Sequence, residues 1–244
     1  MIWGLEWLTV LVVMDNVKKL WVYGCSFSTN FQDLLHLPPI ELEEGWPFML
    51  ADKLNLKLVD RSQPGFGWND INLKLQEDII KNNISKNDLI ILSPSYFQRL
   101  TFPELASNTL NFDNGVGNGD WVGLTAKYGK PQHEVVEINI KRFYYTLTSL
   151  RQLGYKIFGW CWTPDQHKRF QDPVNPYILK LQDYLIPSPN GTLFWEDWIL
   201  HHPECMLIPG KPLPDGGWTG DTHFGKIGHK VTANQFFTFI SNIY

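Results

Sequence analysis

The chain has 244 residues, a length at which a single α/β domain is ordinary, and 43% of them are hydrophobic, enough to bury a full core. Its 21 basic and 25 acidic residues give a net charge of -4 without any basic tract, which argues against nucleic acid or an anionic membrane as partner. Three widely spaced cysteines (Cys25, Cys161 and Cys205) favour a reduced, cytoplasmic protein over a disulfide framework.

The N-terminal stretch, residues 1–13, is apolar but too short to span a bilayer. It also lacks the basic flank and the small-residue cleavage site of a signal peptide. We interpret it as a dispensable extension, with an interfacial membrane anchor as the alternative. Residues 14–244 then form one domain.

The first predicted strand is the apolar run 20–23, which stops at Gly24, where the backbone can turn sharply. Ser26 follows that turn. A serine just past the end of a strand can project its hydroxyl above the sheet edge, a position that suits a nucleophile. Most serines in such a string cap the next helix instead, so Ser26 needs support from elsewhere in the chain.

Helices and strands alternate through the rest of the chain. Their predicted positions are helices at 46–54, 69–82, 134–153, 177–181 and 225–244, and strands at 57–60, 88–92, 155–162 and 205–209. This alternation predicts a parallel sheet covered on both faces, a three-layer α/β/α sandwich of about five strands in flavodoxin-like order. In such sheets ligands bind beyond the carboxyl ends of the strands, where Gly24, Gly65 and Ser95 would lie together. Residues 97–133 contain a Gly-, Asn- and Asp-rich tract and predict a long loop or lid.

The C-terminal part of the chain offers a catalytic base. Asp221 stands two residues before His223, on a predicted loop that enters the last helix. His223 could take the proton of an attacking serine, and Asp221 could fix the tautomer of the imidazole. His229 is the rival base, although we interpret it as a helix side chain with a nearby hydrogen-bond partner.

Three short motifs, in the expected order, resemble the SGNH (GDSL-type) hydrolases. Residues 24–28, Gly-Cys-Ser-Phe-Ser, are similar to the first block, with Cys25 where that family usually has aspartate. Residues 59–71 are similar to the second block, whose glycine lends a backbone N–H to the oxyanion hole. His223, a few residues before a Gly-His pair at 228–229, is similar to the last block.

The resemblance implies the SGNH hydrolase fold, with Ser26 as nucleophile and the backbone N–H groups of Ser26 and Gly65 in the oxyanion hole. The family's third block usually adds an asparagine, which residues 93–99 lack. Ser95 is the nearest positional match there, and Gln98 or Arg99 could also donate.

The family more commonly places its acid three residues before the histidine, where this chain has Gly220. With a two-residue offset, the two side chains can still meet within one turn of the chain, so Asp221 remains the predicted orienting acid.

We therefore predict a serine esterase that hydrolyses a short acyl ester, with O-acetyl on a carbohydrate as the favoured substrate, without a metal or other cofactor. The substrate would be a small molecule or a glycan ester, with no nucleic acid and no membrane span involved, and the oligomeric state stays open.

One alternative is a weak or inactive SGNH-fold protein that binds carbohydrate or another protein through its tryptophans. For each of these tryptophans, however, core packing is favoured over stacking on a sugar. A flavodoxin-like nucleotide binder is a further alternative, but no Gly-x-Gly-x-x-Gly motif or P-loop follows any strand.

Overall fold

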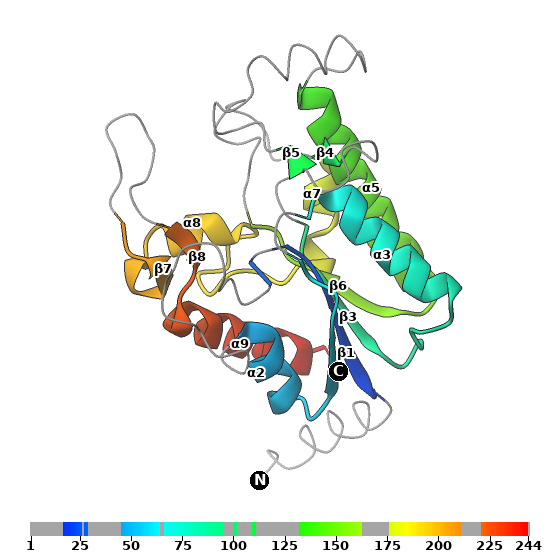
Figure 1. Ribbon diagram of the computed structural model, residues 1–244, viewed down its shortest axis with the longest axis horizontal. Coiled ribbons are helices and arrows are strands. Elements are labelled where there is room, and N and C mark those ends of the chain that lie inside the picture. Colours follow the sequence, from blue (N-terminus) through cyan, green and yellow to red (C-terminus); the bar gives the residue numbers. More distant parts are fainter. Residues whose placement is uncertain are drawn as a thin grey trace.

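Figure 1 shows the computed structural model, which describes residues 17–25, 27–28, 45–63, 66–94, 100–101, 109–110, 132–162, 176–210 and 221–243. Within these residues the main sheet has four parallel strands in the order β2-β1-β3-β6. Its strands are β1 (Lys19–Tyr23), β2 (Lys57–Asp60), β3 (Leu89–Leu92) and β6 (Lys156–Gly159). In the register, Leu20 lies between Leu58 and Leu89. This is the flavodoxin-like order that the alternation predicts.

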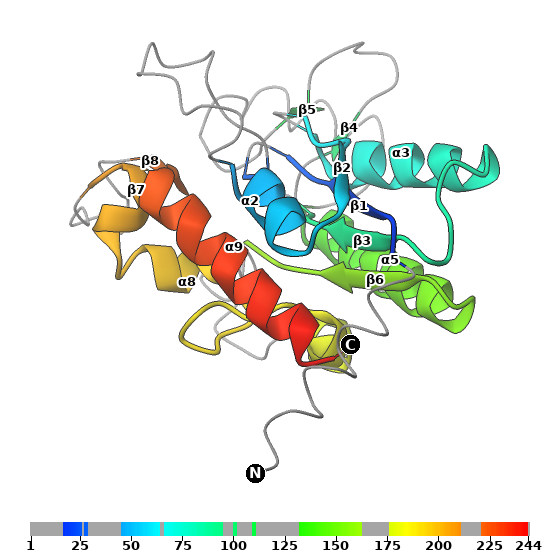
Figure 2. The ribbon, with the colours of Figure 1, turned by 90° about the horizontal axis from the view of Figure 1, so that it is seen from below.

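Helices cover both faces of the sheet, as Figure 2 shows. Their bounds are α2 (Trp46–Lys53), α3 (Trp68–Ile80), α5 (Gln132–Gln152) and α9 (Lys226–Ser241). Side chains of β1 alternate between the two resulting cores: Leu20 and Val22 pack with α2 and α9, whereas Trp21 and Tyr23 pack with α3 and α5. The predicted three-layer α/β/α sandwich is confirmed, but within the described residues its parallel sheet has four strands instead of about five, because the strand predicted at 205–209 pairs outside this sheet.

The remaining elements are short. They are β4 (Leu100–Thr101), β5 (Thr109–Leu110), α7 (Pro176–Lys180), η2 (Gln182–Tyr184), α8 (Trp195–Ile199), η3 (Pro203–Cys205), β7 (Met206–Ile208) and β8 (Asp221–Phe224). The strand predicted at 205–209 forms as β7, but it pairs antiparallel with β8 in a separate two-stranded sheet. The predicted loop at residues 221–224 is wrong. Because β7 supplies backbone hydrogen-bond partners, this segment is extended and forms a strand instead.

The predicted extension, residues 1–13, lies outside the described residues, as does most of the predicted lid at 97–133. The short strands β4 and β5, which pair antiparallel, lie in that region. Among the helices described, none combines the length and the apolar character needed to cross a bilayer.

Tryptophans form much of the core between the sheet and helix α9. Trp160, at the end of β6, contacts Trp46 and Trp195 edge to face, and all three rings are fully buried. Trp68, Trp162 and Trp198 are buried as well. The predicted core-packing role is therefore confirmed for these tryptophans, whereas Trp121 and Trp218 lie outside the described residues.

Candidate active site

The carboxyl ends of β1, β2 and β3 meet at one edge of the sheet. Beyond β2, the Gln63 N–H donates to the Gly24 carbonyl at 3.1 Å. Beyond β3, the Ser93 N–H donates to the Tyr23 carbonyl at 2.7 Å. The chain segments that lead into the second motif and into residues 93–99 therefore start on either side of the end of β1.

The predicted site residues themselves are described in part. Ser26, Gly65 and Ser95 lie outside the described residues. Asp221 is the first residue of β8, but only its backbone is described, and its side chain is not. His223 is described in full and is half-buried.

The chain turns directly after β1, where the Ser28 N–H donates to the Cys25 carbonyl at 2.9 Å. Gly24 is required by this turn. A Cβ atom at position 24 would lie 2.8 Å from Ser28 Cβ and 3.0 Å from Ser93 Cβ, closer than side chains normally approach. The glycine of the first motif therefore lets the turn fold back against β3.

His223 lies at this turn, although it comes from the other end of the chain. Its imidazole stacks on the Phe27 ring with centroids 4.3 Å apart and planes 12° apart. Phe27 is the residue that follows Ser26. The fold thus brings the histidine of the last motif to the serine turn of the first.

His229, the rival base, has a structural role. It is 3% exposed on α9, and its Nδ1 accepts a hydrogen bond from the Trp46 N–H at 3.2 Å. Burial, and then the proximity of His223, lower the pKa of its imidazole to about 3. His229 therefore stays neutral and holds the start of α2, in agreement with the interpretation as a partnered helix side chain.

The glycine of the Gly-His pair has a packing role. A Cβ atom on Gly228 would collide with the Cys205 carbonyl oxygen, which belongs to the backbone between η3 and β7. Glycine therefore lets α9 approach the β7–β8 ribbon closely, and this contact fixes where β8 presents His223.

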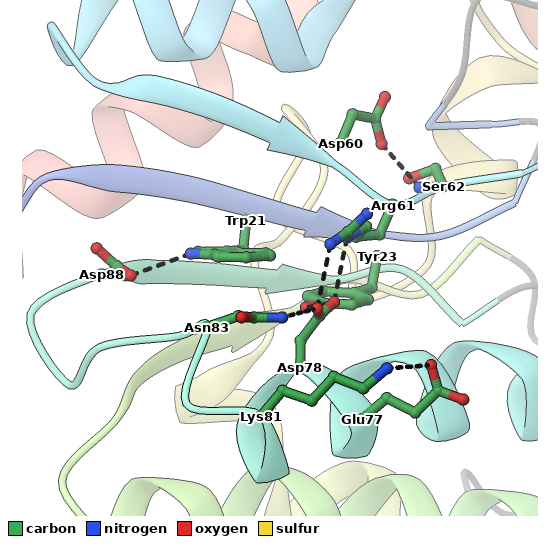
Figure 3. Close-up of polar contacts among 10 residues, drawn as sticks. All are labelled: Trp21, Tyr23, Asp60, Arg61, Ser62, Glu77, Asp78, Lys81, Asn83 and Asp88. Atoms are coloured by element: carbon green, nitrogen blue, oxygen red, sulfur yellow. Dashed lines mark hydrogen bonds and ion pairs between the residues drawn. The ribbon is translucent and has the colours of Figure 1, made fainter.

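A polar network around the buried Asp78 carboxylate supports the other side of the sheet, as Figure 3 shows. The Asp78 carboxylate on α3 accepts hydrogen bonds from the Tyr23 hydroxyl at 2.9 Å and from the Asn83 amide at 2.9 Å. Arg61 donates to both of its oxygens at 3.1 Å. Burial alone would raise the pKa of Asp78, but the hydrogen bonds from Asn83, Tyr23 and Arg61 hold it below its usual value.

Because Arg61 follows β2 directly, this network anchors the start of the loop that carries the second motif. The sequence analysis missed it. A signal was present, because Asp78 falls on the apolar face of α3 with Ile71 and Leu75, where an acidic side chain needs a partner.

The fold is that of the SGNH hydrolases, as the three motifs predicted. No family model matches the sequence, and no curated protein matches it either. Among solved structures, the chain is similar to the psychrotrophic esterase EstA from Pseudoalteromonas sp., with 12% identity and a TM-score of 0.52 over 93% of this chain and 98% of that one.

Two further structures show the same likeness. One is TesA, with 12% identity and a TM-score of 0.51 over 93% of this chain and 100% of that one. The other is a catalytic mutant of Axe2, an acetylxylan esterase from Geobacillus stearothermophilus, with 12% identity and a TM-score of 0.51 over 91% of this chain and 94% of that one. At such low identity these structures establish a shared fold.

Proposed function

We propose that the chain is a serine esterase that hydrolyses a short acyl ester, with an O-acetyl group on a carbohydrate as the favoured substrate. The observation that carries this proposal is the stack of His223 on Phe27, because it brings an imidazole to the residue next to Ser26. Similarity in fold to esterases, one of them an acetylxylan esterase, supports the same reaction class.

In this proposal, His223 takes the proton of the Ser26 hydroxyl as the serine oxygen attacks the ester carbonyl. A bond from the serine oxygen to the acyl carbon forms, the bond to the alcohol oxygen breaks, and His223 passes the proton to the leaving alcohol. Water then attacks the acyl-enzyme with the same proton transfers, which releases the carboxylic acid and restores Ser26.

Three other residues complete the proposed machinery. Asp221 orients the imidazole, because a carboxylate close to a histidine can fix the tautomer of the imidazole and stabilise the imidazolium. The backbone N–H groups of Ser26 and Gly65, with Ser95 as a third donor, hold the developing oxyanion. Loss of one such donor typically costs about 10²–10³ in rate.

A fluorophosphonate probe, which labels activated serines, tests the nucleophile. We expect wild type to be labelled, Ser26→Ala to lose the label, and His223→Ala to react about 10²–10⁴-fold more slowly. Ser28→Ala is the matched control on the same turn. Its hydroxyl is buried without a hydrogen-bond partner within the described residues, so its removal should leave labelling and folding intact.

A series of chromogenic acetate, butyrate and octanoate esters then ranks acyl length, and acetylated xylan tests the glycan. A folded wild type that takes no label and hydrolyses none of these esters would refute the esterase and favour a binding protein.

A further inference from the structure

Three aromatic rings are stacked at the end of β1. Phe27 is the middle ring: its centroid is 3.9 Å from that of Trp162, with planes 21° apart, and 4.3 Å from that of His223, with planes 12° apart. Trp162 comes shortly after β6 and His223 from β8, so the stack joins three separate segments of the chain.

The inner part of this stack is rigidly packed. Phe27 is 2% exposed and Trp162 is 1% exposed. Trp162 also contacts Phe224, the neighbour of His223 in β8, edge to face, with ring centroids 5.3 Å apart. Because its support is buried, the Phe27 ring offers His223 a flat surface that cannot rotate away.

Such a face contact fixes the plane of an imidazole through its π surface, whereas both ring nitrogens lie on the ring edge. Neutral aromatic pairs usually keep centroids about 4.5–7 Å apart and prefer edge-to-face or offset contacts. With centroids 4.3 Å and planes 12° apart, the pair of His223 and Phe27 is closer and more nearly parallel than that, so the Phe27 face limits how the imidazole can tilt.

From this geometry we infer that Phe27, supported by Trp162, is a positioning residue for the proposed base, one that sets the plane of the His223 ring in which a nitrogen takes the proton of Ser26. The inference rests on the proposed function. In this role Phe27 affects the chemical step and leaves substrate binding unchanged.

The test variant is Phe27→Leu, which keeps an apolar side chain but removes the aromatic face. We expect kcat to fall about tenfold, equivalent to about 1.4 kcal/mol, with KM changed less than about twofold. Phe27→Tyr keeps the ring and should restore kcat. Phe143→Leu is the matched control, since it makes the same change at a fully buried phenylalanine on the opposite face of the sheet and should leave kcat unchanged.

A spectroscopic readout tests the contact without any substrate. In protein labelled at histidine, the His223 ring protons, assigned by their loss in His223→Ala, should be shifted upfield by the Phe27 ring current. They should move downfield in Phe27→Leu and stay in place in Phe143→Leu. Unmoved resonances in Phe27→Leu would overturn the orienting contact.

The two measurements together separate the inference from the proposed function. If the resonances move while kcat stays constant, the positioning role is overturned and the esterase stands. If folded wild type hydrolyses no ester, the proposed function fails and so does the catalytic effect of Phe27, while the resonances still decide whether Phe27 holds the ring.

Discussion

His229 makes the stability of the protein depend on pH in a direction that the structure fixes. Burial and the nearby His223 lower the pKa of its imidazole to about 3 in the folded protein, from about 6.5 in an unfolded chain. Between these values the unfolded state binds a proton that the folded state does not. The contribution of His229 to the free energy of unfolding is therefore largest above pH 6.5, and it falls as the pH decreases toward 3.

The size of the loss follows from the two pKa values. At pH 5 the unfolded imidazole is almost fully protonated and the folded one almost fully neutral, so the fall from pH 7 to pH 5 costs about 2 kcal/mol. This figure depends on the unfolded pKa alone, because pH 5 lies well above the folded value.

His229→Asn isolates this contribution. The asparagine oxygen can accept the hydrogen bond that the Trp46 N–H donates to Nδ1, but the amide takes up no proton. We expect the loss of stability between pH 7 and pH 5 to be smaller in the variant than in wild type by about 2 kcal/mol. Urea unfolding followed by tryptophan fluorescence at the two pH values measures it, and all other titrating groups cancel in the comparison.

His201→Asn is the matched control, since it makes the same substitution at an exposed histidine and should keep the wild-type pH dependence. Equal pH dependence in wild type and His229→Asn would refute the argument, because it would mean that the buried imidazole takes up its proton without unfolding.

Two further predictions concern stability and are also measured by urea unfolding. Asp78→Ala leaves the buried Tyr23 hydroxyl without its acceptor, so we expect a loss of about 1–3 kcal/mol, whereas Glu77→Ala removes an exposed ion pair to Lys81 and should cost less than about 1 kcal/mol. Equal losses in the two variants would contradict the role of the network. Gly228→Ala forces a methyl group against the Cys205 carbonyl and should cost about 1–3 kcal/mol; an unchanged midpoint would show that α9 can shift away.

The main sheet could be predicted from the sequence because its signals are local. Residues 89–92 are four consecutive apolar residues between polar flanks, and all four are buried in β3. Asn55 and Asn82, just after α2 and α3, have positive φ and end those helices, so boundaries predicted within one or two residues match the structure.

Strand β8 could not be predicted in the same way. Residues 221–224 are extended because β7 pairs with them, and β7 is set beside them by the packing of α9 against the β7–β8 ribbon. A segment of four residues is too short for its own sequence pattern to predict that it pairs with β7. Its conformation is a tertiary effect.

In the candidate site, too, local features could be predicted from the sequence, whereas tertiary contacts could not. Motifs picked out Ser26 and His223, because a small-residue turn after a strand and an acid near a histidine are visible in the sequence. The stack of His223 on Phe27 and the bond from Trp46 to His229 were not visible, since each joins residues from opposite ends of the chain. Of the two contacts, the stack of His223 on Phe27 connects the two motifs in space.

The part of β8 that carries the last motif pairs irregularly with β7. Ile208 pairs with Asp221 and Met206 with Phe224, so three steps along β8 match two along β7, as at a β-bulge. The regular alternation of side chains along a strand is broken by such a step, so a spacing of two residues is not the same as a shared face here. The proposed relay therefore depends on the contact that the structure does describe, the stack of His223 on Phe27.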